Sequence, residues 1–295
     1  MPITPNPADT QKTMLFGVGL MLLGMAALNA MDAVSKVLAA EYSGVQVTWA
    51  RYFFHLLPMV VFAGPARLRR MISSANPKAQ VLRSAALTLS ALSIITAFSL
   101  MPLADAIAVS FVGPLLMVAL SAWFLGETVG LHRWVSVGLG FIGMLVMVWP
   151  SGGVFEYGAI AALVAALFWA IGLMMTRSVR DDGPWVTLFY TAAGGAVILT
   201  VAVPFFWKMP TLDALVLMVV MGLIGGIAHT LIINAFMHAP ASMLAPYNYT
   251  LLVWATLYGW LLFGDLPSGR AVLGAAIIVA AGLYALHRER QSGSA

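Results

Sequence analysis

Three charged side chains stand in stretches of sequence that are otherwise apolar. Asp32 and Lys36 lie four residues apart, so they share one face of a helix, and Arg51 follows in the next stretch. This charge cluster could bind the amine and the carboxylate of a zwitterion. It could equally neutralise itself and only tie two helices together, with Lys36 and Arg51 extending toward water. The residue types leave both roles open.

Two histidines occupy the same kind of stretch. His55 follows Arg51 by one helical turn, and His229 precedes Asn234 in a later stretch. Imidazole changes its charge near neutral pH, so His55, His229 and Asp32 are candidate proton carriers. A lone histidine on an apolar helix is otherwise a packed, hydrogen-bonded residue. The sequence holds no cysteine and no HExxH or similar clustered spacing, so we expect neither a metal nor a cofactor.

Aromatic and amide side chains complete the candidate binding residues. Most of them lie within apolar stretches, where they could stack on an apolar or aromatic substrate and order its polar ends. Ordinary helix packing is the alternative for each, and a buried asparagine needs a hydrogen-bond partner in either case. These residues are Asn29, Trp169, Tyr190, Asn234, Tyr247, Asn248, Tyr249 and Trp254.

The composition is typical of an all-α polytopic membrane protein. Hydrophobic residues make up 61% of the chain and charged residues 9%, whereas a soluble domain carries about 25% charged residues. Ten apolar segments are long enough to cross about 30 Å of hydrocarbon as helices. We place these spans at residues 14–38, 44–63, 80–101, 103–125, 130–149, 157–178, 185–206, 211–237, 241–263 and 269–287.

The basic residues predict how these helices are oriented. With the N-terminus in the cytoplasm, eleven lysines and arginines fall on the inner side and three on the outer side, which is the bias that insertion favours. Both tails, residues 1–13 and 288–295, are then cytoplasmic. The same bias explains the net charge of +4 without a nucleic-acid partner. It predicts a multi-pass protein of the inner (plasma) membrane, surrounded by lipids.

The sequence repeats itself at an offset of about 138 residues. Thr96–Glu127 and Asn234–Asp265 share four identities, Ala97/Ala235, Phe98/Phe236, Pro102/Pro240 and Gly126/Gly264. A second match, GVQVT at 44–48 with GPWVT at 183–187, has nearly the same offset. We therefore divide the chain into repeats at 14–150 and 157–287. Each has five spans, an odd number, so the second is inverted relative to the first, and transporters built in this way hold substrate between the halves.

Each repeat closes with a glycine and an acid, Gly126-Glu127 and Gly264-Asp265, before a last helix rich in glycine and alanine. With ten spans arranged as five plus five, the chain resembles the EamA group of the drug/metabolite transporter superfamily, and within it the YddG-type amino-acid exporters. The resemblance implies a basket of ten helices around a central cavity. It also implies export of aromatic or other neutral amino acids and related metabolites. One departure is Pro114, which has Leu252 at the repeated position.

The sequence thus predicts a secondary active or facilitative transporter that exports amino acids by alternating access, as a monomer or a homodimer. A nucleoside, a sugar or a drug-like compound is the alternative substrate within the same superfamily. An intramembrane enzyme would need a nucleophile, a metal or a cofactor, and the chain has no Walker loop, GxSxG motif or pair of facing aspartates. A channel would predict symmetry about the membrane normal rather than inversion.

Overall fold

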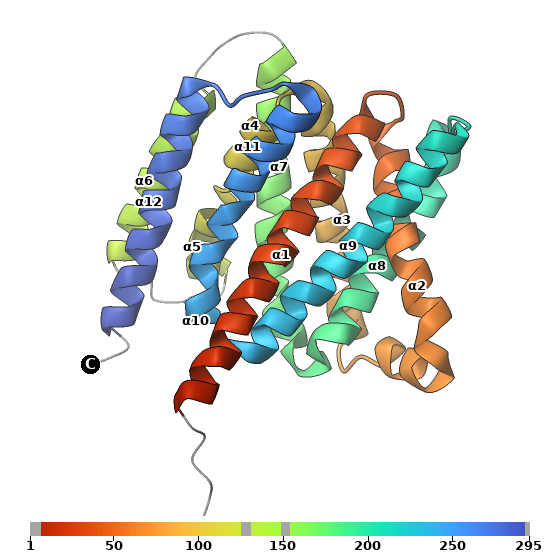
Figure 1. The fold of residues 1–295 in the computed structure, drawn as a ribbon, viewed down its shortest axis with the longest axis horizontal. Helices are drawn as coiled ribbons and strands as arrows, with labels where there is room; N and C mark the ends of the chain where they lie inside the picture. Colours follow the sequence, from red (N-terminus) through yellow and green to blue (C-terminus); the bar gives the residue numbers. More distant parts are fainter. Residues whose placement is uncertain (1–6, 125–130, 149–153, 293–295) are drawn as a thin grey trace, which may run out of the picture.

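The computed structural model describes residues 7–124, 131–148 and 154–292, and within these ranges it contains helices and turns but no strands. Figure 1 shows the chain running back and forth along the bundle, with the start of α1 and the end of α12 at the same, lower side. An even number of passages across the bundle produces this arrangement. The Gly126-Glu127 turn of the first repeat lies outside the described residues.

The first half of the chain forms α1 (Pro7–Ala39), α2 (Gly44–Ile72), α3 (Pro77–Leu100), α4 (Leu103–Ser110), α5 (Gly113–Phe124) and α6 (Leu131–Val148). The second half forms α7 (Val154–Met175), η1 (Thr176–Asp182), α8 (Gly183–Ala202), η2 (Val203–Phe206), α9 (Leu212–His238), α10 (Ala241–Leu244), η3 (Ala245–Tyr249), α11 (Thr250–Phe263) and α12 (Gly269–Ser292).

Helices occupy all ten of the predicted segments, but not all of them are equally clear as membrane spans. Six helical stretches are long and apolar enough by themselves to cross a bilayer, namely Lys12–Ala39, Pro77–Leu100, Leu103–Leu120, Tyr157–Met175, Ser178–Phe206 and Leu212–His238. Two shorter apolar helices, Trp134–Val146 and Gly269–Tyr284, accompany them. The protein is therefore a helical membrane protein, and ten crossings stay a prediction.

Side-chain caps and proline set the ends of several helices. Ser43, Asn76 and Thr211 each accept a backbone hydrogen bond from the residue three positions later, which satisfies one free N–H at the start of α2, α3 and α9. α11 ends at Gly264, whose φ of 69° is a left-handed conformation that glycine adopts without strain. α2 bends at Gly64, beside Pro65, where the glycine φ is 70°.

The fourth and ninth predicted spans differ from the single helices that the sequence predicts. The fourth is broken at Phe111 and Val112, between α4 and α5, and the ninth passes through the 3-10 segment η3. Proline explains both breaks, because it lacks an N–H and its ring collides with the carbonyl four residues earlier. Pro114 ends α4 at Ser110 in this way, and Pro246 lies inside η3.

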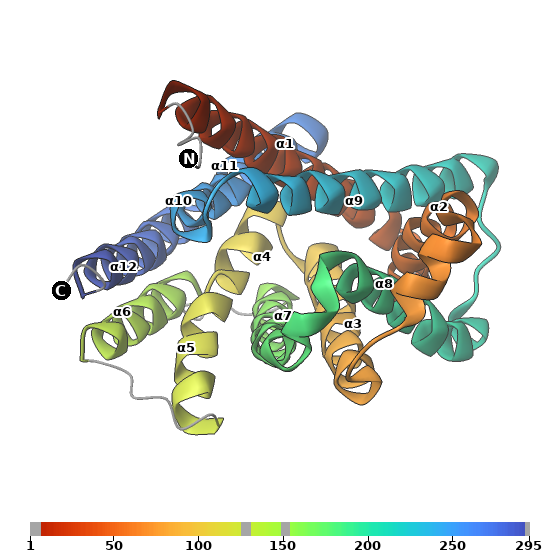
Figure 2. The same ribbon diagram turned by 90° about the horizontal axis from the view of Figure 1, so that it is seen from below.

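The main helix pairs each join one half of the chain to the other. α1 packs along α9, α3 along α7, α2 against α8 and α6 against α12. Figures 1 and 2 show the α6–α12 pair at one end of the molecule and the α2–α8 pair at the other. Buried methionine, alanine and aromatic side chains, including Met31, Phe98 and Met221, fill the space between the pairs. The halves therefore share one core.

Glycine allows the closest of these approaches. A Cβ atom added to Gly222 of α9 would collide with Phe54 Cβ and would lie 2.6 Å from the backbone carbonyl carbon of Phe54 on α2. Real Cβ atoms essentially never come so near a backbone atom, so any larger residue at 222 would push the two helices apart.

Candidate functional site

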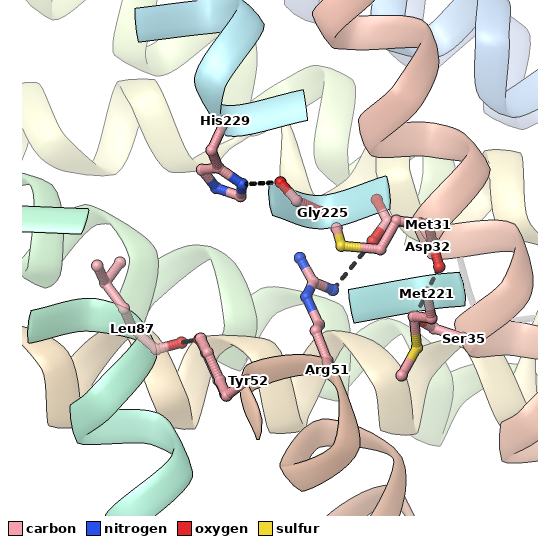
Figure 3. Close-up of polar contacts among 9 residues, drawn as sticks. All are labelled: Met31, Asp32, Ser35, Arg51, Tyr52, Leu87, Met221, Gly225 and His229. Atoms are coloured by element: carbon pink, nitrogen blue, oxygen red, sulfur yellow. Dashed lines mark hydrogen bonds and ion pairs between the residues drawn. The ribbon is translucent and has the colours of Figure 1, made fainter. Parts of the chain in front are cut away.

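An ion pair joins α1 to α2 near the line where both helices meet α9. Arg51 Nη1 lies 3.0 Å from Asp32 Oδ1, and the two side chains are only 17% and 13% exposed. Figure 3 shows the Arg51 side chain extending from α2 toward Asp32. One turn along α1, the Ser35 hydroxyl lies 3.1 Å from the sulfur of Met221 on α9. The pair therefore lies beside the contact between the two halves.

Lys36 does not join this pair, which corrects the predicted three-residue charge cluster. Its ammonium donates to Met101 O at 3.0 Å and to Asp265 Oδ2 at 3.1 Å, and it lies 4.9 Å from the centre of the Phe263 ring. One turn of α1 separates Asp32 from Lys36, and Asp265 occupies the turn beyond α11 at the upper end. Lys36 therefore ties the two halves together at that end.

The two histidines face each other from α2 and α9. Their ring centroids are 5.4 Å apart. His229 Nδ1 lies 2.8 Å from Gly225 O, and because a carbonyl can only accept, this nitrogen carries the proton. His55 Nε2 is buried and has no hydrogen-bond partner among the described residues. The pair thus offers one imidazole nitrogen that is free to bind a proton or a polar ligand atom.

Two of the other candidate residues also carry buried polar atoms without partners in the described part of the chain. Asn29 is fully buried, and neither its amide nitrogen nor its amide oxygen is hydrogen-bonded. Trp254 stacks on Tyr258, but its indole Nε1 has no acceptor. An unsatisfied buried group costs about 1–3 kcal/mol, so native proteins rarely leave one without a reason. A polar substrate is one source of the missing partners.

Other candidate residues are satisfied by backbone carbonyls. Tyr190 donates to Ile72 O at 2.8 Å, which places its hydroxyl at the lower end of the bundle. Asn234 and Asn248 bond to carbonyls of their own helical segments, Thr230 O at 2.8 Å and Ala245 O at 3.2 Å. These contacts favour the packing interpretation for the three residues.

The remaining aromatic candidates lie near the broken spans. Trp169 of α7 is 37% exposed and packs against Gly113 at the start of α5. Tyr247 and Trp254 both pack against a buried cluster that includes Met21 and Met25 of α1. Tyr249 stacks on Phe111, a residue that the sequence does not distinguish from any other phenylalanine in an apolar helix.

A network around Asp182, which we call the lower latch, closes the end of the bundle opposite Lys36. The Asp182 carboxylate accepts hydrogen bonds from Ser74 Oγ at 2.5 Å, Ala75 N at 2.6 Å and Gln80 Nε2 at 2.8 Å. Asp182 belongs to the second half and its donors to the first. The sequence contains a signal for this contact, since Asp182 precedes the repeated GPWVT segment. Its donors lie about 100 residues away, two in the loop between α2 and α3 and the third, Gln80, in the first turn of α3, and nothing in their types marks them.

The upper end has a matching contact between α2 and the segment before α9. Gln46 Nε2 donates to Lys208 O at 2.8 Å, and Lys208 N donates to Gln46 Oε1 at 3.0 Å. Lys208 also lies 3.6 Å from Glu41 Oε1. Polar contacts thus tie the halves together at both ends.

Two apolar pockets of about 490 Å³ each open between helices. One lies between α2, α8 and α9, where His55, Trp185 and Thr230 are among its lining residues. The other lies between α4, α11 and α12, beside Leu252 and Ala271. The Asp32–Arg51 pair lines neither pocket, so the central cavity stays a prediction.

Comparison with known proteins agrees with a transporter. The model of the EamA-like transporter family matches residues 15–149 and again residues 156–286. An S-adenosylmethionine uptake transporter of Rickettsia bellii is 29% identical over 290 residues, covering 97% of this chain and 98% of that protein. A riboflavin transporter of Vibrio cholerae is 33% identical over 187 residues, 60% of each protein. A solved crystal structure that covers 95% of this chain and 98% of its own has a TM-score of 0.63 at 18% identity, which indicates a shared fold.

Proposed function

Since this chain belongs to the EamA-like transporter family, we propose that it takes up a metabolite bearing an α-amino-acid group across the inner membrane by alternating access. S-adenosylmethionine is the leading candidate. The chain is a multi-pass membrane transporter rather than an enzyme. The proposal adds the substrate, the direction and the mechanism.

The observation that carries this proposal is the buried Asp32–Arg51 ion pair beside the contact between the halves. A substrate with an amine and a carboxylate can replace each partner of such a pair, its amine binding Asp32 and its carboxylate binding Arg51 in a bidentate manner. Exchange of one pair for two new pairs limits the desolvation cost of binding. The unpartnered Asn29 amide, one turn before Asp32, supplies a donor and an acceptor for a further polar edge.

The packing supports an inverted-repeat architecture of ten spans in the proposal. Spans one and three are α1 and α3, and spans six and eight are α7 and α9. If span one corresponds to span six and span three to span eight, the α1–α9 contact corresponds to the α7–α3 contact, with the two halves exchanged. Both broken spans also occupy corresponding positions. In this arrangement, release of the upper contact of Lys36 opens one side, and release of the lower latch opens the other. We place both tails in the cytoplasm from the distribution of basic residues.

The direction and the substrate in the proposal follow the relatives that cover nearly the whole chain. The Rickettsia proteins are named as S-adenosylmethionine uptake transporters, and S-adenosylmethionine carries the amino-acid group that the ion pair suits. Export of free aromatic amino acids, as the sequence resemblance implies, is the second candidate, because the same ion pair would bind them. Tyr249 and Trp254 would then contact the substrate side chain.

Transport assays separate these candidates. Bacterial cells that express the protein are expected to accumulate radiolabelled S-adenosylmethionine from the medium, with saturation, and purified protein in proteoliposomes is expected to catalyse counterflow of it. Unlabelled methionine, phenylalanine, riboflavin and a sugar serve as competitors. Saturable flux of phenylalanine out of preloaded cells, without S-adenosylmethionine flux, would favour the second candidate. Flux of sugars alone would remove both.

A further inference from the structure

Two aromatic rings meet where the two broken spans cross. Phe111 occupies the break between α4 and α5, and Tyr249 ends η3, where the ninth span resumes as α11. Their ring centroids are 5.5 Å apart and their planes are inclined by 25°, a stacked arrangement. Phe111 and Tyr249 also correspond to each other at the repeat offset of 138 residues. One ring thus comes from each half, from the same position of the repeat.

If spans four and nine cross the membrane as predicted, the breaks place both rings inside the bilayer. α4 has 8 residues, so it descends about 12 Å from the upper end before Phe111, at about 1.5 Å per residue. α10 and η3 climb a similar distance from the lower end before Tyr249. Approached from opposite sides of a hydrocarbon layer about 30 Å thick, the two residues meet near its middle, where transporters hold their substrates.

The surroundings of the pair are shaped by small residues and further aromatic groups. Gly113, two residues after Phe111, lies against the Trp169 indole, since a Cβ there would be 3.0 Å from Trp169 Cε3. Gly282 of α12 leaves room for the Tyr249 hydroxyl in the same way. Both stacked residues are only partly buried. The rings therefore lie among close neighbours but are not enclosed in a fully packed core.

We propose that Phe111 and Tyr249 form a ring clamp that selects substrates carrying a flat aromatic ring. In the structure the rings stack on each other. When the halves separate, the substrate ring enters between the Phe111 and Tyr249 rings and stacks on each of them. It thereby takes the place of the aromatic partner that each residue has lost. A substrate without a ring leaves the two faces uncovered. The inference rests on the proposed function, because it names which part of the substrate the clamp holds.

The test compares a ring-bearing substrate with its ring-free counterpart in the same protein. Phe111→Leu and Tyr249→Leu keep an apolar side chain and remove the flat face. Each is expected to raise KM for S-adenosylmethionine by about 5- to 150-fold, the range that corresponds to removal of one base-stacking side chain. KM or the inhibition constant for methionine, which has the same amino-acid group but no ring, is expected to stay at the wild-type value. Phe111→Tyr, which keeps the ring, is expected to retain the wild-type ratio of KM for S-adenosylmethionine to KM for methionine.

The matched control is Phe53→Leu. Phe53 stacks on Trp49 with centroids 4.8 Å apart and planes inclined by 17°, so the variant removes a similar stacked ring from α2, away from the broken spans. It is expected to leave both constants unchanged. Stabilisation of the purified variants against heat by added S-adenosylmethionine reports binding without transport, and the melting temperature without ligand reports whether they fold.

An equal change in the two constants, or no change in either, would overturn the clamp while leaving the transport function intact. If the protein instead carries amino acids, the same ratio is measured with phenylalanine against leucine. If neither Phe111→Leu nor Tyr249→Leu changes the ratio of KM for phenylalanine to KM for leucine, the clamp is also overturned. Failure of the proposed function appears separately, as absence of S-adenosylmethionine flux in the wild-type protein.

Discussion

Replacement of Arg51 by glutamine removes one charge of the buried ion pair and leaves Asp32 behind. The pair is 3.0 Å long, and both side chains are less than one fifth exposed, so water does little to compensate the remaining carboxylate. Removal of one partner from a buried pair costs about 3–5 kcal/mol. We therefore expect Arg51→Gln to lower stability strongly. This result alone would not separate a structural role from substrate binding.

A neutral double variant separates the two roles. Asp32→Asn together with Arg51→Gln keeps two groups that can hydrogen-bond and leaves no unpaired charge, so its stability is expected to return to within about 1.5 kcal/mol of wild type. Substrate binding would not return with it. Each charge-assisted hydrogen bond contributes about 1.5–3 kcal/mol, so loss of one raises KM by about 10- to 150-fold. Loss of both is expected to abolish measurable S-adenosylmethionine counterflow.

The assay measures thermal unfolding of the purified variants and initial rates of counterflow in proteoliposomes made with equal amounts of folded protein. Arg180→Gln together with Asp181→Asn is the control. It neutralises an exposed ion pair, 3.8 Å long, away from Asp32 and Arg51. This control is expected to leave KM near the wild-type value, because it touches neither the candidate binding site nor the contacts of Lys36 and Asp182.

A neutral Asp32/Arg51 double variant that is stable and transports with wild-type KM would refute the reasoning. The ion pair would then serve only to join α1 to α2, and the zwitterion would bind elsewhere. A double variant as unstable as Arg51→Gln would also contradict the expected recovery, because it would show that the charges themselves hold the fold.

Three further predictions concern the latch, the helix contact and the proton carriers. Asp182→Asn weakens the lower latch, so a Ser84→Cys reporter in this cysteine-free chain is expected to react faster with maleimide; an unchanged rate would mean that the latch does not gate this end. Gly222→Ala forces a Cβ against α2 and is expected to cost about 1–3 kcal/mol of stability, whereas Gly138→Ala, with open space around it, is expected to be neutral or stabilising; equal effects would contradict the packing argument. His55→Gln is expected to flatten the pH dependence of transport if the imidazole carries a proton, and an unaltered pH profile would exclude it as a carrier.

Several parts of the fold follow from local sequence. The predicted spans coincide with helical segments, apart from the breaks in the fourth and ninth, because long apolar runs can satisfy their backbone groups in a membrane only within a helix. Ser43, Asn76 and Thr211 begin helices for equally local reasons. Membership in the EamA-like family, inferred from the repeated layout, is confirmed. The YddG-type assignment and the inverted arrangement stay predictions.

The candidate site could be predicted only in part. Asp32 and Arg51 belong to neighbouring helices, so their pairing is nearly a local property. The partner of Lys36 is Asp265, 229 positions away along the chain, and no spacing rule connects them. The sequence also did not reveal the role of Phe111. Pro114 indicates that the helix is distorted nearby, but not that Phe111 at the break stacks on Tyr249.

The amino-acid sequence by itself determined that this chain is a helical membrane protein, that it repeats, and which charged groups stand within apolar stretches, since composition and apolar length control insertion directly. Only the tertiary structure decided that Phe111 stacks on Tyr249 and that Lys36 pairs with Asp265 instead of Asp32. It also decided that Asp182 joins the two halves at the lower end of the bundle. Partner choice depends on which helices approach each other, and that approach is set by the packing of both halves together rather than by any single segment.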